Sequence, residues 1–147
     1  MATTRPVVYP GGAVIHHEQD EYGPLDVVEE GDGKLRSLHF GSSARQSTMF
    51  VARPEELALD YTRCMMTALL FMETEPTRAL VLGLGGGSMV KFLLHSCGPC
   101  TVDVAELRPA VVDVAQRFFG LPEPNKRLHL HVGDAHAYLR GTTAPPW

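Results

Sequence analysis

The second half of the chain alternates between short apolar runs and segments with helical spacing. Apolar runs at Ala79–Leu82 and Thr101–Ala105, and an alternation of apolar residues with histidines over Arg127–Val132, predict three strands. Each strand is followed by a segment typical of a helix, at residues 89–95, 109–119 and 135–139. Strands that alternate with helices at this spacing predict a parallel α/β sheet with right-handed connections.

Glycines and prolines interrupt the first fifty residues, which contain only short apolar runs. These runs predict strands at residues 7–9, 13–15, 25–29 and 34–40. The step Gly31-Asp32-Gly33 predicts a hairpin, and hence a small antiparallel sheet. A helix is predicted from Arg53 to Met72, because Pro54 suits a first helical turn. One face of that helix is expected to be buried through Leu57, Tyr61, Met65, Ala68, Leu69 and Met72.

The run Gly83–Ser88 directly follows the strand predicted at Ala79–Leu82. A strand that breaks into glycines before a helix presents backbone N–H groups and a helix N-terminus to a nucleotide or nucleoside. Glu106 lies nineteen residues after Gly87 at the end of the next strand, where its carboxylate can accept two ribose hydroxyls. Asp134 follows the third strand, so three strand ends meet at one edge of the sheet.

Three interpretations of the glycine loop differ in what it binds. A dinucleotide fingerprint calls for glycine or alanine at position 88, and this chain has Ser88. The spacing Gly83-x-Gly85-x-Gly87 with a later acidic residue is closer to the loops that hold S-adenosylmethionine or a related nucleoside. The third interpretation is a tight turn between strand and helix that binds nothing. Glu106 and Asp134 favour a binding site.

Composition and charge limit the partners that the chain is expected to have. With 147 residues and 44% hydrophobic content, the chain can bury one core. The net charge of −4 argues against a surface that binds nucleic acid. No apolar run approaches the roughly 18 residues that span a bilayer, and the N-terminus lacks a secretory signal pattern. Three cysteines suit a reducing compartment, so we expect a cytoplasmic location and no membrane partner.

Cysteine, histidine and serine motifs suggest other chemistry only weakly. The motif Cys97-Gly98-Pro99-Cys100 follows a predicted helix, and the negative end of that helix opposes thiolate formation. We therefore predict a loop in which glycine caps the helix. A reversible disulfide between the two cysteines is the alternative. His129 and His131 share one face of a strand. No third ligand accompanies them at a recognisable spacing, so we predict no metal site. Ser47 and Ser88 have no partners in a triad-like order.

Taken together and in this order, the motifs resemble those of the spermidine synthases, the polyamine aminopropyltransferases. The resemblance covers roughly residues 22–140 and rests on a combination of features. These are a β-rich segment that ends near Gln46, a helix that contains Tyr61, the loop Gly83–Ser88, a strand that ends at Glu106, and a third strand that ends at Asp134. The resemblance implies a Rossmann-like sheet of the S-adenosylmethionine type, preceded by a small antiparallel β appendage.

The resemblance also implies the substrates and the residues that hold them. The expected ligand is S-adenosylmethionine or its decarboxylated form, with a polyamine as a second small molecule and no metal. Position by position, Gly83, Gly85 and Gly87 would flank the methionine-like moiety, Glu106 would hold the ribose hydroxyls, Asp134 with Ala135 would face the adenine amino group, and Gln46 would close the pocket. The implied reaction is aminopropyl transfer from the sulfonium to an amine in polyamine biosynthesis.

The chain departs from the family pattern at three places. Gly86 stands where the family has an aspartate that grips the aminopropyl amine, and Thr62-Arg63 replaces its His-Glu pair beside Tyr61. The sequence ends at Trp147, before the strand that carries the family's catalytic aspartate, so we assign no catalytic residue and expect a C-terminally truncated chain. We expect one unit over residues 1–52 and an incomplete nucleoside-binding domain over residues 53–147.

Truncation would leave an apolar edge on the strand at Ala79–Leu82, which a second copy of the chain could cover. Two alternatives to aminopropyl transfer follow from these departures. One is a class I methyltransferase that uses S-adenosylmethionine, which Gly86 favours. The other is a non-catalytic interaction module that pairs with a partner through the open sheet edge.

Overall fold

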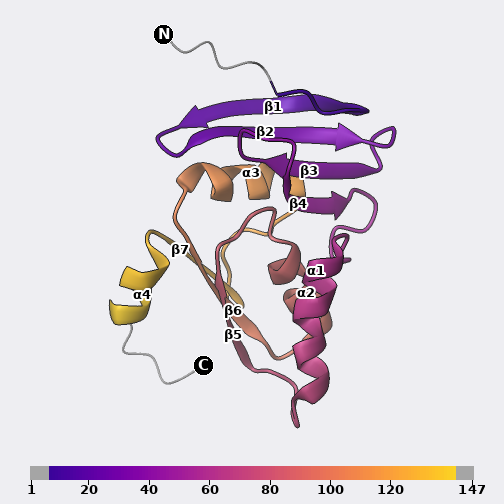
Figure 1. Ribbon diagram of the computed structural model, residues 1–147. Coiled ribbons are helices and arrows are strands. Elements are labelled where there is room, and N and C mark those ends of the chain that lie inside the picture. Colours follow the sequence, from indigo (N-terminus) through magenta and orange to yellow (C-terminus); the bar gives the residue numbers. More distant parts are fainter. Residues whose placement is uncertain (1–6, 142–147) are drawn as a thin grey trace.

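The computed structural model describes residues 7–141 and contains two sheets (Figure 1). Residues 1–6 and 142–147, the outer ends of the two predicted units, lie outside the described residues. The first sheet is antiparallel, with its strands in chain order: β1 (Gly12–Asp20), β2 (Gly23–Glu30), β3 (Leu35–His39) and β4 (Arg45–Phe50). The predicted antiparallel sheet is therefore confirmed.

The antiparallel sheet differs from its prediction at two places. Residues 7–9 form no strand, and β4, which carries Gln46, was not predicted as one. The hairpin between β2 and β3 is confirmed. Three of its four connecting residues have positive φ angles, at 59° for Gly31, 56° for Asp32 and 80° for Gly33, a conformation that glycine and aspartate tolerate best.

The second sheet is parallel and alternates with helices as predicted. Its strands are β5 (Arg78–Leu82), β6 (Thr101–Glu106) and β7 (Leu128–Val132), in the order β5-β6-β7. The helices that follow them are α2 (Ser88–Ser96), α3 (Pro109–Phe119) and α4 (Ala135–Gly141). Within the described residues β5 pairs with β6 alone, so β5 forms an edge of this sheet and β6 its centre.

The helix predicted over Arg53–Met72 was wrong in its first turns and in its buried face. The structure has α1 (Asp60–Met66), followed by the 3-10 helix η1 (Thr67–Phe71). Arg53 still pairs with Phe50 at the end of β4, and this pairing overrides the helix-starting preference of the proline that follows. Leu57 is buried, but Tyr61 and Met65 are 53% and 51% exposed.

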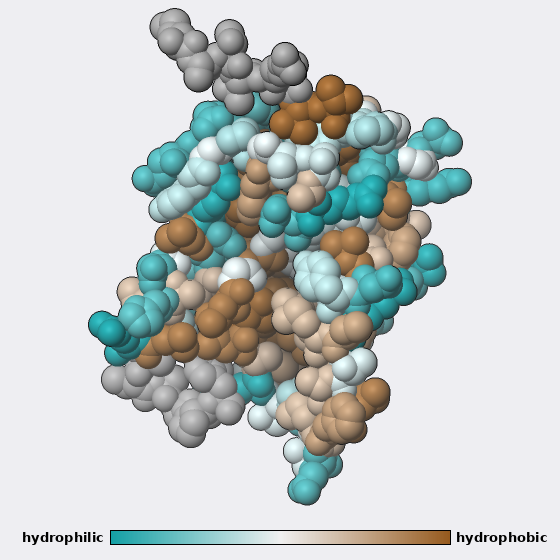
Figure 2. Space-filling model, viewed as in Figure 1, coloured by the Kyte–Doolittle hydropathy of each residue, from teal (hydrophilic) through white to brown (hydrophobic). Residues whose placement is uncertain are grey.

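Hydrophobic side chains gather at the surface along this helical segment. Leu70 and Phe71 of η1 are 81% and 87% exposed. Figure 2 shows brown atoms over the lower end of the α1–η1 segment. Of the residues predicted to be buried, Ala68 and Met72 are exposed as well as Tyr61 and Met65, so the prediction that this face packs against the rest of the chain was wrong for most of its residues.

A single hydrophobic core joins the two sheets. Leu25, Val27, Leu38 and Met49 of the antiparallel sheet pack in one cluster with buried residues of α2, α3 and the parallel sheet. α3 lies directly beneath the antiparallel sheet (Figure 1). This packing places the loop between β5 and α2 against β4. Among residues 7–141, no helix is both long and apolar enough to cross a membrane.

Candidate functional site

The loop between β5 and α2 has the backbone conformation that only glycine adopts readily. The φ angles of Gly83, Gly85 and Gly87 are 84°, 55° and 71°, and Gly87 is the N-cap of α2. The Gly83 N–H donates to the carbonyl of Ala105 on β6 at 2.9 Å, and the Gly87 N–H donates to that of Leu84 at 2.9 Å. The loop is therefore a tight turn anchored on the central strand. Among residues 7–141, no atom outside the two chain neighbours lies within 4 Å of the place where a Cβ of Gly83 would sit, so this end of the loop is open.

Two serines attach the loop to β4. The Ser47 and Ser88 hydroxyls lie 3.2 Å apart, and the Ser88 hydroxyl also lies 3.4 Å from the Thr48 carbonyl. Both serines are buried. They join the antiparallel sheet to the first turn of α2, and sequence analysis gave neither of them this role.

Gly86 leaves no space for a side chain. A Cβ at this position would lie 2.8 Å from Phe119 Cδ1 and 2.8 Å from Ser47 Oγ, which is closer than real Cβ contacts. The residue is buried between β4 and the end of α3. In this packing, an aspartate at position 86 would need both neighbours to move.

The Glu106 carboxylate lies at the centre of the site. Its Oε2 accepts the Leu84 N–H of the glycine loop at 2.7 Å, and its Oε1 accepts the Arg108 N–H at 2.8 Å. Glu106 is 8% exposed. Each carboxylate oxygen can accept two hydrogen bonds, so both oxygens retain acceptor capacity for a ligand. The structure thus brings Glu106 to the glycine loop, as the sequence predicted.

Gln46 also lies beside the glycine loop, at the start of β4. Its backbone carbonyl oxygen is 3.9 Å from the Cβ position of Gly85 and accepts a hydrogen bond from the Tyr61 hydroxyl at 3.4 Å. Gln46 itself is exposed. The backbone of Gln46 therefore connects α1 with the loop, and the predicted role of its side chain in closing a pocket stays a prediction.

Asp134 and Ala135 follow β7, one strand further along the same edge of the sheet. The backbone there is tied to the site because the Gly133 N–H donates to the Glu106 carbonyl at 2.8 Å. Asp134 is exposed, and its Oδ1 accepts the Ala137 N–H at 2.8 Å, which caps the start of α4. The proposed adenine contact therefore belongs to a residue that already stabilises a helix.

Exposed apolar side chains lie at the ends of the three parallel strands, and Val132 pairs with Glu106 in the sheet register. Leu82, Leu107 and Val132 are 52%, 45% and 54% exposed at the ends of β5, β6 and β7. A buried carboxylate at the same sheet edge as exposed apolar side chains suits a ligand that joins a sugar to a flat aromatic base.

His129 and His131 share a face of β7, as predicted, and both face Asp103 of β6. Their ring nitrogens lie 3.2 and 3.4 Å from the same oxygen of Asp103. Sequence analysis missed this third residue, because register between strands is needed to place it. Within residues 7–141 no group of three or more histidine, cysteine or acidic side chains could hold a metal ion.

Cys97 and Cys100 are buried free thiols on either side of the exposed residues Gly98 and Pro99 after α2. Burial raises the pKa of both thiols, and Glu75 raises the pKa of Cys97 further. The backbone differs from the predicted glycine cap, because Cys97 is the C-cap and Gly98 does not adopt a positive φ. A raised thiol pKa disfavours the thiolate that redox chemistry requires.

Comparison with known proteins gives this arrangement a family context. No protein-family model matches the chain. A polyamine aminopropyltransferase of Chromobacterium violaceum is 39% identical over 123 residues, which is 81% of this chain and 46% of that protein. The chain is a relative of the polyamine aminopropyltransferases. It spans about half the length of the curated relatives that it matches.

Solved structures agree with this relationship at the level of the fold. A probable spermidine synthase of Corynebacterium glutamicum matches with a TM-score of 0.76 over 89% of this chain and 48% of its own, at 17% identity. Human methyltransferase-like protein 13, solved with SAH, matches with a TM-score of 0.55 over 60% of this chain and 44% of its own, at 26% identity. Both polyamine aminopropyltransferases and methyltransferases therefore share this Rossmann-like fold.

Proposed function

We propose that the chain binds S-adenosylmethionine, its decarboxylated form or a related thioether nucleoside at the carboxyl edge of the parallel sheet. The observation that carries the proposal is the buried Glu106 carboxylate, held at 2.7 Å by the glycine loop and still able to accept ribose hydroxyls. A spermidine synthase with a TM-score of 0.68 to this chain was solved with the transition-state analogue AdoDATO. That ligand is consistent with a sulfonium nucleoside here.

Aminopropyl transfer is the reaction that we propose for the whole protein. An amine nitrogen attacks the carbon beside the sulfonium, a C–N bond forms, the C–S bond breaks with its electrons passing to sulfur, and the amine loses a proton. The chain's own part is to orient the nucleoside so that the reacting carbon lies in line with the amine. Gly83, Gly85 and Gly87 would flank the chain attached to sulfur, and Glu106 would fix the sugar. Gln46, Asp134 and Ala135 would complete the pocket.

Titration calorimetry of the wild type with S-adenosylmethionine, decarboxylated S-adenosylmethionine and methylthioadenosine tests the binding site. Glu106→Gln should weaken nucleoside binding by about tenfold to a hundredfold, because hydrogen bonds to a charged acceptor are lost. Asp103→Asn is the matched control, since Asp103 is also a buried carboxylate on β6 but contacts His129 and His131 instead. Absence of heat with all three ligands would overturn the proposal.

The packing around Gly86 favours a second candidate function, methyl transfer. Because a side chain at this position would meet Phe119 and Ser47, no carboxylate can grip the amine of a decarboxylated nucleoside from here without rearrangement. A methyltransferase would bind S-adenosylmethionine more tightly than the decarboxylated form, and an aminopropyltransferase would show the reverse order. The same titration therefore separates the two functions.

A further inference from the structure

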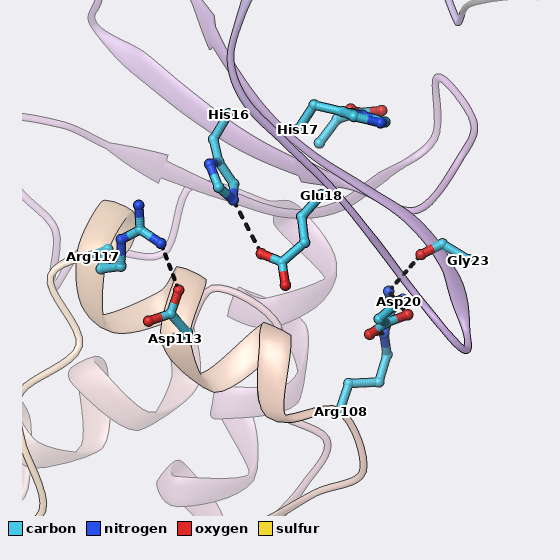
Figure 3. Close-up of polar contacts among 9 residues, drawn as sticks. His16, His17, Glu18, Asp20, Gly23, Arg108, Asp113 and Arg117 are labelled. Carbon is cyan, nitrogen blue, oxygen red and sulfur yellow. Dashed lines mark hydrogen bonds and ion pairs between the residues drawn. The ribbon is translucent and has the colours of Figure 1, made fainter.

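Arg108 donates hydrogen bonds both from its backbone N–H and from its side chain. Its N–H donates to Oε1 of Glu106 at 2.8 Å. Its guanidinium reaches the turn between β1 and β2, where Nε lies 3.0 Å and Nη2 lies 2.8 Å from the two carboxylate oxygens of Asp20. Figure 3 shows Arg108 extending from the start of α3 toward Asp20 and Gly23.

The contact between Arg108 and Asp20 is geometrically specific and well shielded. Nη2 of Arg108 also donates to the Gly23 carbonyl at 3.1 Å, and the guanidinium lies 4.6 Å from the centre of the Phe40 ring. Arg108 is 7% exposed. The paired hydrogen bonds from Arg108 hold the pKa of Asp20 below its usual range. A bidentate arginine–carboxylate pair of this kind fixes the relative orientation of the two side chains as well as the distance between them.

We infer that Asp20 and Arg108 form a positioning pair for the Glu106 carboxylate. The Glu106 carboxylate accepts hydrogen bonds from two backbone N–H groups. One is the N–H of Leu84 in the glycine loop, and the other is the N–H of Arg108. Because Asp20 holds the Arg108 side chain, the antiparallel sheet sets where that N–H points. The inference rests on the proposed nucleoside site and adds to it that ribose recognition depends on a residue of the other sheet.

A second attachment between the sheet and α3 provides a matched control. Arg36 of β3 forms an ion pair with Glu29 and donates from Nη1 to the Phe118 carbonyl at 2.6 Å, at the opposite end of α3 from Arg108. This attachment also joins the antiparallel sheet to α3, but within residues 7–141 no hydrogen bond connects Arg36 or Glu29 with Glu106. Loss of either attachment should loosen the interface, and only loss of the Asp20 contact should disturb the carboxylate.

The test compares binding of methylthioadenosine and its 2′-deoxy analogue to the full chain by calorimetry. The wild type should prefer the ribose form by about tenfold or more, since the deoxy analogue leaves an acceptor on Glu106 unpaired. Asp20→Asn should reduce that preference by about threefold or more, Asp20→Glu should restore it in part, and Arg36→Gln should leave it unchanged. Equal preference in the wild type and Asp20→Asn would overturn the inference while leaving the nucleoside site intact.

Three further results complete the test. Equal loss of preference in Asp20→Asn and Arg36→Gln would overturn the inference, because it would show general loosening. No binding of either nucleoside by the wild type would overturn the proposed function and this inference together.

Amide hydrogen exchange on the folded, ligand-free protein gives an independent measurement. In this measurement, Asp20→Asn should reduce protection of the Arg108 N–H by about tenfold and leave protection of the Lys91 N–H, in α2, unchanged. Unchanged protection at Arg108 would overturn the inference.

Discussion

An added methyl group at Gly86 tests the packing of the glycine loop, because its φ is not positive and only its neighbours oppose a side chain. Gly86→Ala should lower the free energy of unfolding by about 1–3 kcal/mol, because the new Cβ would lie 2.8 Å from both Phe119 and Ser47. Urea denaturation measures the change. Gly98→Ala is the control, since its φ is not positive and, apart from its chain neighbours, no atom of residues 7–141 lies within 4 Å of its Cβ position. Equal stability of the two variants would contradict the packing described for the loop.

The residues that form the site and those that hold them in place differ in how well the sequence predicts them. Glu106 and the loop glycines follow from local patterns, a strand end and a turn, which need no knowledge of the tertiary fold. Asp20 and Arg108 lie 88 positions apart, and Ser47 and Ser88 lie 41 apart. Contacts of this kind depend on how the two sheets pack, and no local pattern marks them.

At the scale of a single element, α4 depends on its N-cap. Asp134→Ala should remove the hydrogen bond to the Ala137 N–H and destabilise the helix by about 1 kcal/mol. Amide exchange of residues 137 and 138 would report this as faster exchange. Asp134→Ser should preserve the cap, since a serine hydroxyl accepts the same bond, so weaker nucleoside binding in that variant isolates the proposed adenine contact. Unchanged exchange in Asp134→Ala would contradict the capping role.

Two segments with regular apolar spacing, residues 109–119 and 53–72, differ in how well the sequence predicts the bounds of the helix. α3 begins at Pro109 and ends at Phe119, as predicted, and Gly120 caps it with a φ of 67°. Val111, Val114, Ala115 and Phe119 on this helix are buried in the core that joins the two sheets. The segment 53–72 carries equally good spacing, but β4 continues to pair through Arg53, and Leu57 anchors the turn that follows. Tertiary packing therefore decides where α1 begins.

At the scale of the whole molecule, a buried lysine lies where the two sheets meet. Lys91 of α2 is 6% exposed. Its Nζ donates to the Phe119 carbonyl of α3 at 2.5 Å and lies 3.3 Å from the sulfur of Met49 on β4. Burial lowers the pKa of Lys91 from 10.5 to about 8, against the opposing effect of Glu55. The Lys91 amino group therefore contacts both β4 of the antiparallel sheet and α3, which covers the parallel sheet.

This lysine predicts a pH dependence of stability with a definite sign. Between pH 8 and 10.5 the unfolded chain binds the Lys91 proton and the folded chain has released it, so the free energy of unfolding rises with pH through this interval. The lowered pKa corresponds to at most about 3 kcal/mol. Lys91→Met should remove this rise, and the difference between the two proteins in denaturation from pH 7 to 11 isolates it from the cysteines, whose raised pKa acts in the opposite direction. Parallel pH profiles would show that Lys91 is charged in the folded protein throughout, and that the junction of the two sheets admits enough water to solvate it.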